Sequence, residues 1–148
     1  MPRRLYVRPV RLADLDEILD IERASFGHDA YDRKLFAAFT RKCGDLFLVA
    51  ESELSVLGYS IAGIRLGRAE LVSIAVHPRH RRRGVAAALM DSTLRRLRRR
   101  RVSRFVLMVK VNNHKAMAFY EKYGFRRYRR VPAYYEDGAD GLGFVKQL

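Results

Sequence analysis

The stretch LVSIAVHPRHRRRGVAAALMDSTLRRLRRRR, Leu71–Arg101, decides how the rest of the chain is arranged. Five of its first six residues are apolar and three are β-branched, which predicts a strand over Leu71–Val76. Pro78 ends that strand because proline donates no ladder hydrogen bond. A run of good helix formers begins directly after Gly84. Because the turn between strand and helix carries Arg81–Arg83, its free N–H groups and positive charge predict a binding site for a phosphate-like anion.

The composition describes a folded chain with an unusual charge. Its 148 residues suit a single domain over 1–148, and a hydrophobic content of 49% supports a real core. The net charge of +14 at pH 7 favours anionic partners. The one cysteine, Cys43, excludes an internal disulfide, and the four histidines show no metal-ligand spacing, so we expect no metal. No long apolar stretch is present, which predicts no membrane span and a cytoplasmic protein.

The N-terminal half predicts two helices followed by a hairpin. Apolar residues at helical spacing, acidic residues in a first turn and glycine stops mark the helices, and β-branched runs mark the strands. The predicted elements are a strand over Leu5–Pro9, helices over Ala13–Phe26 and Tyr31–Lys42, and paired strands over Leu46–Ala50 and Val56–Ile64.

The C-terminal half predicts alternating helices and strands. The central helix is expected to continue through the arginine run to Arg101, and Asn112–Asn113 should cap the next helix. The predicted elements are a strand over Phe105–Val111, a helix over His114–Tyr123, and strands over Phe125–Val131 and Leu142–Val145. This order predicts a mixed α/β (α+β) fold in which helices cover a mostly antiparallel central sheet.

Three segments carry a resemblance to a known family. Arg81–Ala86, RRRGVA, fits R/Q-x-x-G-x-G/A; Val109–Phe125, VKVNNHKAMAFYEKYGF, resembles V-R-x-S-N-x-x-A-x-x-x-Y-E-x-x-G-F; and Tyr134–Asp140, YYEDGAD, resembles Y-Y-x-D-G-E-D. Their order and spacing resemble the GNAT superfamily of N-acetyltransferases, in its RimI-like branch of protein N-terminal (Nα) acetyltransferases. Before Leu71 the chain matches that branch only in general layout.

The resemblance implies the GNAT acyl-CoA N-acyltransferase fold and acetyl-CoA as cofactor. A backbone N–H near Val76 would polarise the thioester carbonyl. Asn113 would either fix the pantetheine arm or serve only as a helix cap. The implied cofactor-binding residues are Ile74, Ala75, Val76, Arg81, Arg82, Arg83, Gly84, Val85, Ala86, Asn113 and Tyr120.

The resemblance also implies that Tyr120 protonates the departing thiolate. The branch carries a glutamate base on the strand before its V-R, and this chain has Met108 there, which cannot accept a proton. The base is therefore elsewhere or unnecessary. Glu70 and His28 are the favoured candidates, with Glu22 and His77 as alternatives. Even spacing along a strand predicts that Glu70 shares a face with Val72, Ile74 and Val76.

A weak base favours an α-amine as the acetyl acceptor. An α-amine has a pKa of roughly 7.7 to 8.0 against about 10.4 for lysine, so neutralising it at pH 7.5 costs well under about 1 kcal/mol rather than about 4. We therefore expect a protein or peptide N-terminus, ribosomal or nascent, as substrate and direct transfer in a ternary complex. Tyr134 and Tyr135 would bind the peptide backbone, and Phe26 and Tyr31 would line the pocket for its first residue.

Other functions stay open on the sequence alone. The run Arg95–Arg101 is either a solvated helix end or a contact to the ribosome or RNA. A lysine side chain or a small-molecule amine is the alternative acceptor. The alternative function that is not enzymatic is a basic RNA- or DNA-binding module, although the sequence contains no nucleic-acid recognition motif.

Overall fold

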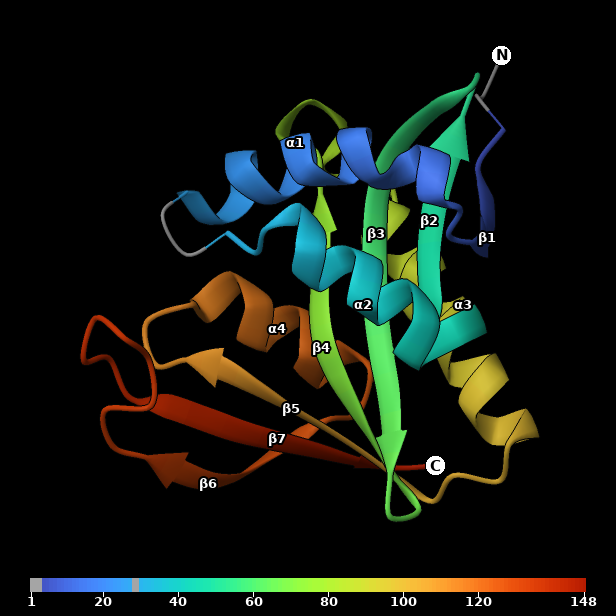
Figure 1. Ribbon diagram of the computed structural model, residues 1–148. Coiled ribbons are helices and arrows are strands. Elements are labelled where there is room, and N and C mark those ends of the chain that lie inside the picture. The colour runs from blue at the N-terminus through green and yellow to red at the C-terminus, as the bar shows by residue number, and fades with distance from the viewer. Residues whose placement is uncertain (1–3, 28–29) are drawn as a thin grey trace.

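The computed structural model describes residues 4–27 and 30–148, which fold as helices on both faces of a mixed sheet (Figure 1). Its seven strands run in the order β1-β2-β3-β4-β5-β7-β6 in the described part of the chain. Only β4 and β5 pair in parallel there, so the predicted mostly antiparallel sheet is confirmed. The strands are β1 (Tyr6–Pro9), β2 (Phe47–Ser52), β3 (Ser55–Arg65), β4 (Arg68–Val76), β5 (Arg104–Lys110), β6 (Arg126–Val131) and β7 (Gly141–Gln147).

The four α-helices among these residues are α1 (Leu15–Phe26), α2 (Arg33–Cys43), α3 (Val85–Arg99) and α4 (His114–Lys122), with short 3-10 turns at Leu12–Asp14, Gly44–Leu46 and Pro78–His80. Helices α1 and α2 cover one face of β2–β4 and bury residues such as Ile18 and Phe36 against Phe47. Helices α3 and α4 cover the opposite face. Every described helix is too short or too polar to cross a lipid bilayer.

Close approach of α3 to the sheet requires a glycine on β3. A Cβ added at Gly58 would lie 2.8 Å from the Ala75 carbonyl oxygen and 3.0 Å from Val85 Cγ1. Because no side chain intervenes, the start of α3 lies directly against the beginning of β3 and the end of β4. The turn that leads into α3 is thereby fixed beside the end of β4.

Element ends differ from the predictions where local caps act. Asp32 accepts a hydrogen bond from the Leu35 backbone N–H at 2.9 Å, so α2 begins at Arg33 rather than at Tyr31. The arginine run does not continue the helix to Arg101, because α3 ends at Arg99 and Arg101 adopts a left-handed φ of 58°.

A β-bulge overturns the predicted face of Glu70. Ile61 pairs with Ser73 while Ala62 pairs with Leu71, so Val72 is an extra residue on β4. Before the bulge, Glu70 and Val72 face the α1–α2 side; after it, Ile74 and Val76 face α3. Glu70 therefore does not share a face with Ile74 and Val76.

Candidate functional site

The site is built where β4 and β5 separate. The two strands pair only at Arg68/Arg104, Ala69/Phe105 and Glu70/Val106 in the described ladder, and then diverge (Figure 1). From Leu71 to Val76 the edge of β4 that faces β5 has no strand partner among the described residues. Backbone groups along this edge are therefore open to a ligand, and the role expected for the Val76 N–H stays a prediction.

The turn after β4 forms a cradle at the start of α3. Gly84 adopts φ +77°, and a Cβ built there would meet no atom within 4 Å, so open space lies above the turn. The first N–H groups of the 15-residue α3 carry the positive end of its dipole. Arg81 Nε donates to the Val76 carbonyl at 3.3 Å, which ties the turn to the strand end. Arg82 and Arg83 are exposed, and Arg83 lines a small pocket of about 150 Å³.

Helix α4 presents Tyr120 from the same face of the sheet as α3. Its ring is buried and packs edge-on against Phe119 and Phe125, with centroid separations of 5.5 and 5.8 Å. Burial raises the pKa of Tyr120 well above its usual value, and nearby Tyr135 raises it further, with no hydrogen bond contributing. The phenol is therefore held neutral and able to donate a proton.

Asn113 caps the start of α4, as predicted, and its proposed contact with the pantetheine arm stays a prediction. Asn113 Oδ1 accepts from the Ala116 backbone N–H at 3.2 Å, which leaves its amide N–H2 group for a ligand. The other end of α4 is tied to α3, because the Tyr123 hydroxyl donates to the Ala87 carbonyl, and lies within hydrogen-bond distance of Asp91, at 3.0 Å each. Tyr120 is thus placed rigidly with respect to the cradle.

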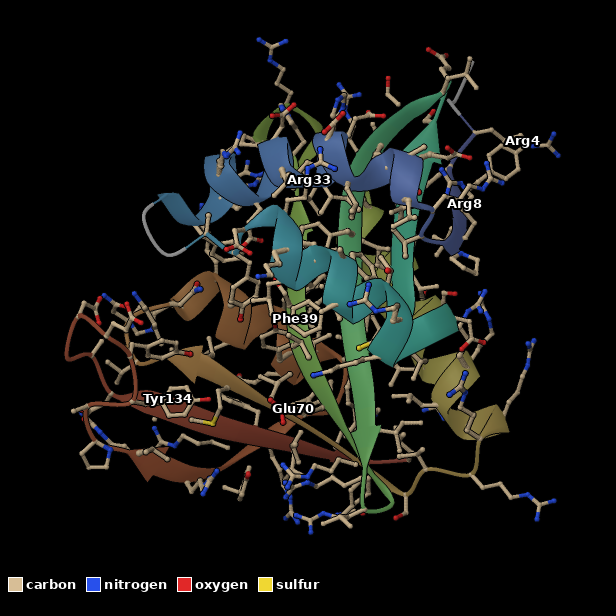
Figure 2. The ribbon with its side chains drawn as sticks, in the orientation of Figure 1. Arg4, Arg8, Arg33, Phe39, Glu70 and Tyr134 are labelled. Atoms are coloured by element: carbon tan, nitrogen blue, oxygen red, sulfur yellow. The ribbon has the colours of Figure 1, made fainter. Side chains whose placement is uncertain are left out.

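Tyr31, Tyr134 and Tyr135 lie near one another on the α1–α2 side of the sheet. Tyr31 is half-buried and packs on Phe36 and Phe39, each at 6.0 Å between centroids. Burial raises the pKa of Tyr31, and Glu22, Tyr134 and Glu70 add to the rise, so all three lie close enough to act on it. Figure 2 shows Glu70 and Tyr134 below α2 and Phe39.

The loop that carries Tyr134 and Tyr135 is held by aspartates. Asp140 accepts from the Ala133 backbone N–H at 2.9 Å and from Arg130 Nε at 2.7 Å. These bonds hold the pKa of Asp140 below its usual value. The two tyrosine rings meet edge-on at 4.9 Å. The loop therefore holds the two tyrosine rings in a fixed arrangement near Tyr31.

A hydrogen-bond chain on the α1–α2 side of the sheet joins α1, β3 and β4. Glu22 is 1% exposed and accepts from the Tyr59 hydroxyl and, at 2.8 Å, from the Tyr31 backbone N–H. The Tyr59 hydroxyl also lies 3.0 Å from Ser73 Oγ on β4. Burial raises the pKa of Glu22, while its two hydrogen bonds oppose that rise. These hydrogen bonds fix the backbone at Tyr31, just before α2, to the bulged part of β4.

The base candidates are placed differently. Glu70 is exposed and lies close enough to Tyr31 to raise the pKa of that tyrosine, and it is four residues before Ile74, which is about 13 Å along a strand. His77 caps a 3-10 turn through Nδ1, 3.1 Å from the Arg79 backbone N–H, so it has a structural task. His28 lies outside the described residues. The Met108 methyl group lies against Gly141, where an added Cβ would be 2.7 Å away.

Of the four residues predicted to bind the substrate, the structure brings the three tyrosines together and leaves Phe26 apart. Tyr134 lies close enough to raise the pKa of both Tyr31 and Tyr135, and burial is the main cause that raises the pKa of Tyr135 to about 12. Phe26 is 41% exposed at the end of α1, and the ring pairs found among the described aromatic residues do not include it.

A sequence profile of the Acetyltransferase (GNAT) family matches residues 13–125, which run from the turn before α1 to the end of the α4 region. The chain belongs to the GNAT acetyltransferase family. The resemblance and the fold predicted from the sequence are thereby confirmed.

The GNAT chain is similar to several known proteins along nearly its whole length. It is 30% identical to the N-alpha-acetyltransferase of Saccharolobus solfataricus over 159 residues, covering 99% of this chain and 95% of that protein. The crystal structure of Ard1 from Thermoplasma volcanium superposes with a TM-score of 0.94 at 28% identity, covering 97% of both chains. The ribosomal-protein-S18-alanine N-acetyltransferase from Escherichia coli superposes with a TM-score of 0.85 at 25% identity, covering 97% and 94%.

The GNAT cofactor is acetyl-CoA, and the residues present fit it. The cradle offers helix N–H groups, positive charge and open space above Gly84 for a diphosphate. The unpaired edge of β4 offers backbone groups for the amide-containing pantetheine arm.

Sequence reasoning missed Tyr59, Ser73 and Tyr123. Ser73 is the one hydroxyl residue in the apolar run Leu71–Val76, which was a usable signal for a buried polar contact. Tyr59 and Tyr123 carry no local signal, because their partners lie on other elements, 37 and 32 or more residues away.

Proposed function

We propose that this acetyltransferase moves an acetyl group from acetyl-CoA to the α-amino group of a protein or peptide N-terminus in the cytoplasm, within a ternary complex. The observation that carries the proposal is the position of Tyr120. It packs on the α3–α4 side with Leu71 of β4 and Leu107 of β5, and the nearby Tyr135 also lies close to Tyr31 and Tyr134. The names of the relatives, N-alpha-acetyltransferase among them, support the same acceptor.

Bound acetyl-CoA would supply an acetyl thioester. The cradle residues Arg81–Ala86 would hold its diphosphate, and Ile74–Val76 with Asn113 would hold its pantetheine arm. The Val76 backbone N–H would donate to the carbonyl oxygen as negative charge develops there. The Tyr120 hydroxyl, kept protonated by burial, would give its proton to the leaving sulfur.

The amine would bind beside Tyr31, Tyr134 and Tyr135 and would need little help from a base. An α-amine is already partly neutral near pH 7.5, and lysine is not. Glu70, which lies near Tyr31, would attract the protonated form of the amine and take its proton through a water molecule. His28 is the second candidate for this task. The tyrosines Tyr134 and Tyr135 would bind the peptide backbone, with Tyr31 and Phe26 beside its first residue.

The deciding experiment measures acetyl transfer to peptides that vary at their first two residues. Matched peptides with a blocked N-terminus and one lysine serve as controls, and spermidine represents small amines. We expect the free α-amine peptides to be modified at least about 100-fold faster, since neutralising lysine costs about 3 to 4 kcal/mol more. Predominant modification of lysine or spermidine would contradict the proposed acceptor. No response of the melting temperature to acetyl-CoA would instead favour the nucleic-acid-binding module.

We also propose that the arginine run Arg95–Arg101 contacts RNA near the site of protein synthesis. Arg96 and Arg100 form ion pairs with Asp45, so these two have a structural partner. Arg95, Arg98, Arg99 and Arg101 form no ion pair with any described acidic residue and supply the free charge. The triple variant Arg95→Gln/Arg98→Gln/Arg99→Gln should bind ribosomes more weakly than the wild-type protein. Unchanged binding in a sedimentation assay at 100 mM salt would leave the run as a solvated helix end.

A further inference from the structure

A second arginine-rich surface lies on the sheet itself, on the face away from α3 and α4. Residues directly opposite in a ladder share a face, and neighbours along a strand alternate. Ala69, Phe105 and Phe144 point into the core beneath α3 and α4, so the residues beside them point the other way. This face of the described sheet carries Arg65, Arg68, Arg104, Arg126 and Arg129, which we call the sheet-face arginines.

No described helix covers this surface. In Figure 1, α1 and α2 cross in front of β2, β3 and β4, while the front of β5, β7 and β6 is open. All five sheet-face arginines are exposed. Figure 2 shows nitrogen-tipped side chains gathered around the lower end of the sheet, below the labelled Glu70.

The arrangement is electrostatically unfavourable without a partner. Arg68 is paired directly with Arg65 on one side and with Arg104 on the other, and like charges placed opposite one another destabilise a sheet. None of the three forms an ion pair with a described acidic residue. A bound polyanion would relieve this repulsion.

Protection of a sheet edge does not explain these positions. Charged residues often guard an exposed edge strand, and this reading suits Arg126 and Arg129 on β6. It fails for Arg68 and Arg104, because β4 and β5 lie inside the described sheet with a strand on each side. Their charge therefore has a purpose other than blocking edge-to-edge pairing.

An aromatic ring completes the surface. Tyr128 on β6 is 41% exposed, and its ring lies against Gly143, where an added Cβ would be 2.9 Å away. The guanidinium of Arg129 lies 5.6 Å from the centroid of that ring. An exposed ring on the basic face of a sheet is the arrangement that stacks unpaired bases.

We propose that the sheet-face arginines and Tyr128 bind single-stranded RNA. Planar guanidinium groups pair with phosphate oxygens through two parallel hydrogen bonds, and arginine supplies all five positive charges of this set. The broad face of a sheet cannot enter the groove of a duplex, whereas a splayed strand can lay its phosphates across β4, β5 and β6 with a base on Tyr128. An acidic peptide would use the charge and have no use for the ring. The proposal does not depend on which amine receives the acetyl group.

The test measures the anisotropy of a fluorescein-labelled 15-nucleotide single-stranded RNA between 50 and 300 mM salt. The sheet-face variant is Arg68→Gln/Arg104→Gln/Arg126→Gln. The matched control, Arg23→Gln/Arg41→Gln/Lys42→Gln, removes the same three charges from the exposed surfaces of α1 and α2. Tyr128→Ala is the fourth protein. Because like-charge repulsion is relieved, the sheet-face variant should melt no lower than the wild-type protein and keep its activity on a short peptide.

We expect the sheet-face variant to bind RNA about 100-fold more weakly at 100 mM salt, with a salt slope about 2 smaller, since three phosphate contacts are lost. The control should lose only severalfold. Tyr128→Ala should weaken RNA binding about tenfold or more without changing the slope. Equal losses from the two triple variants would overturn the proposal. Displacement of the RNA by a polyglutamate peptide of the same charge, at similar concentration, would also overturn it and would indicate an acidic protein partner.

Discussion

Replacing Tyr59 with phenylalanine tests the buried chain that joins Glu22 to Ser73. The Tyr59 ring is fully buried and phenylalanine fills the same space, so the change removes only the hydroxyl. Glu22 then loses a charge-assisted hydrogen bond, and such bonds contribute about 1.5 to 3 kcal/mol. Ser73 is half-buried, so water replaces its partner at little cost. We expect Tyr59→Phe to lower the free energy of unfolding by about 2 to 3 kcal/mol at pH 7.5.

The size of this loss should depend on pH. Burial raises the pKa of Glu22, and the hydrogen bond from Tyr59 opposes the rise, so removing the hydroxyl raises that pKa further. A carboxyl whose pKa is higher in the folded than in the unfolded state reduces stability at pH values above its folded pKa. That reduction disappears as the pH falls below the unfolded value of 4.5. The loss caused by Tyr59→Phe should therefore be largest at neutral pH and smaller at pH 5.

Urea unfolding at pH 7.5 and 5.0 measures both effects. Ser73→Ala is the matched control, because it removes the far end of the chain without touching the carboxylate, and it should cost about 1 kcal/mol at both pH values. In a Glu22→Gln background, Tyr59→Phe should cost about 1 kcal/mol with no pH dependence. An equal loss at both pH values and in both backgrounds would refute Glu22 as the charged partner.

Three further predictions concern the site. Tyr120→Phe should reduce kcat by about 10² to 10⁴ with little change in the KM for acetyl-CoA or in melting temperature, and an unchanged kcat would remove the tyrosine from proton transfer. Gly84→Ala places a side chain at φ +77°, so it should cost about 1 to 2 kcal/mol of stability and weaken CoA binding by calorimetry; wild-type affinity would mean that the turn is not the diphosphate cradle. Asp140→Ala releases the Ala133 N–H and Arg130, so it should raise the KM for peptide several-fold and leave the KM for acetyl-CoA unchanged, whereas equal rises in both would indicate general loosening.

The fold followed from the sequence wherever local patterns decided it. The β-branched run before Pro78, the glycine before α3 and the asparagine cap before α4 gave elements whose positions are confirmed within a few residues. The geometry of the turn proposed to hold the cofactor followed for the same reason, since strand, turn and helix are consecutive in sequence.

Features that depend on contacts between distant elements could not be predicted. The bulge at Val72 is set by pairing with β3, and it reversed the face expected for Glu70. The Glu22–Tyr59–Ser73 chain joins three elements across the sheet, and no periodicity marks it. The end of α3 at Arg99 reflects a left-handed turn at Arg101, a conformation that an arginine run does not signal.

The separation of β4 from β5 divides the sheet into two half-sheets that share three ladder pairs within the described region. Behind the opening, the Tyr123 hydroxyl joins α4 to α3, and the core beneath these helices packs residues of both halves together. A ligand bound in the opening would therefore contact both half-sheets and stabilise their association. At a free ligand concentration of 100 times its dissociation constant, binding would add about 2.7 kcal/mol to the free energy of unfolding. The lifetime of this protein under proteolysis should then follow the supply of acetyl-CoA, so that starvation for the donor would deplete the enzyme as well as its reaction.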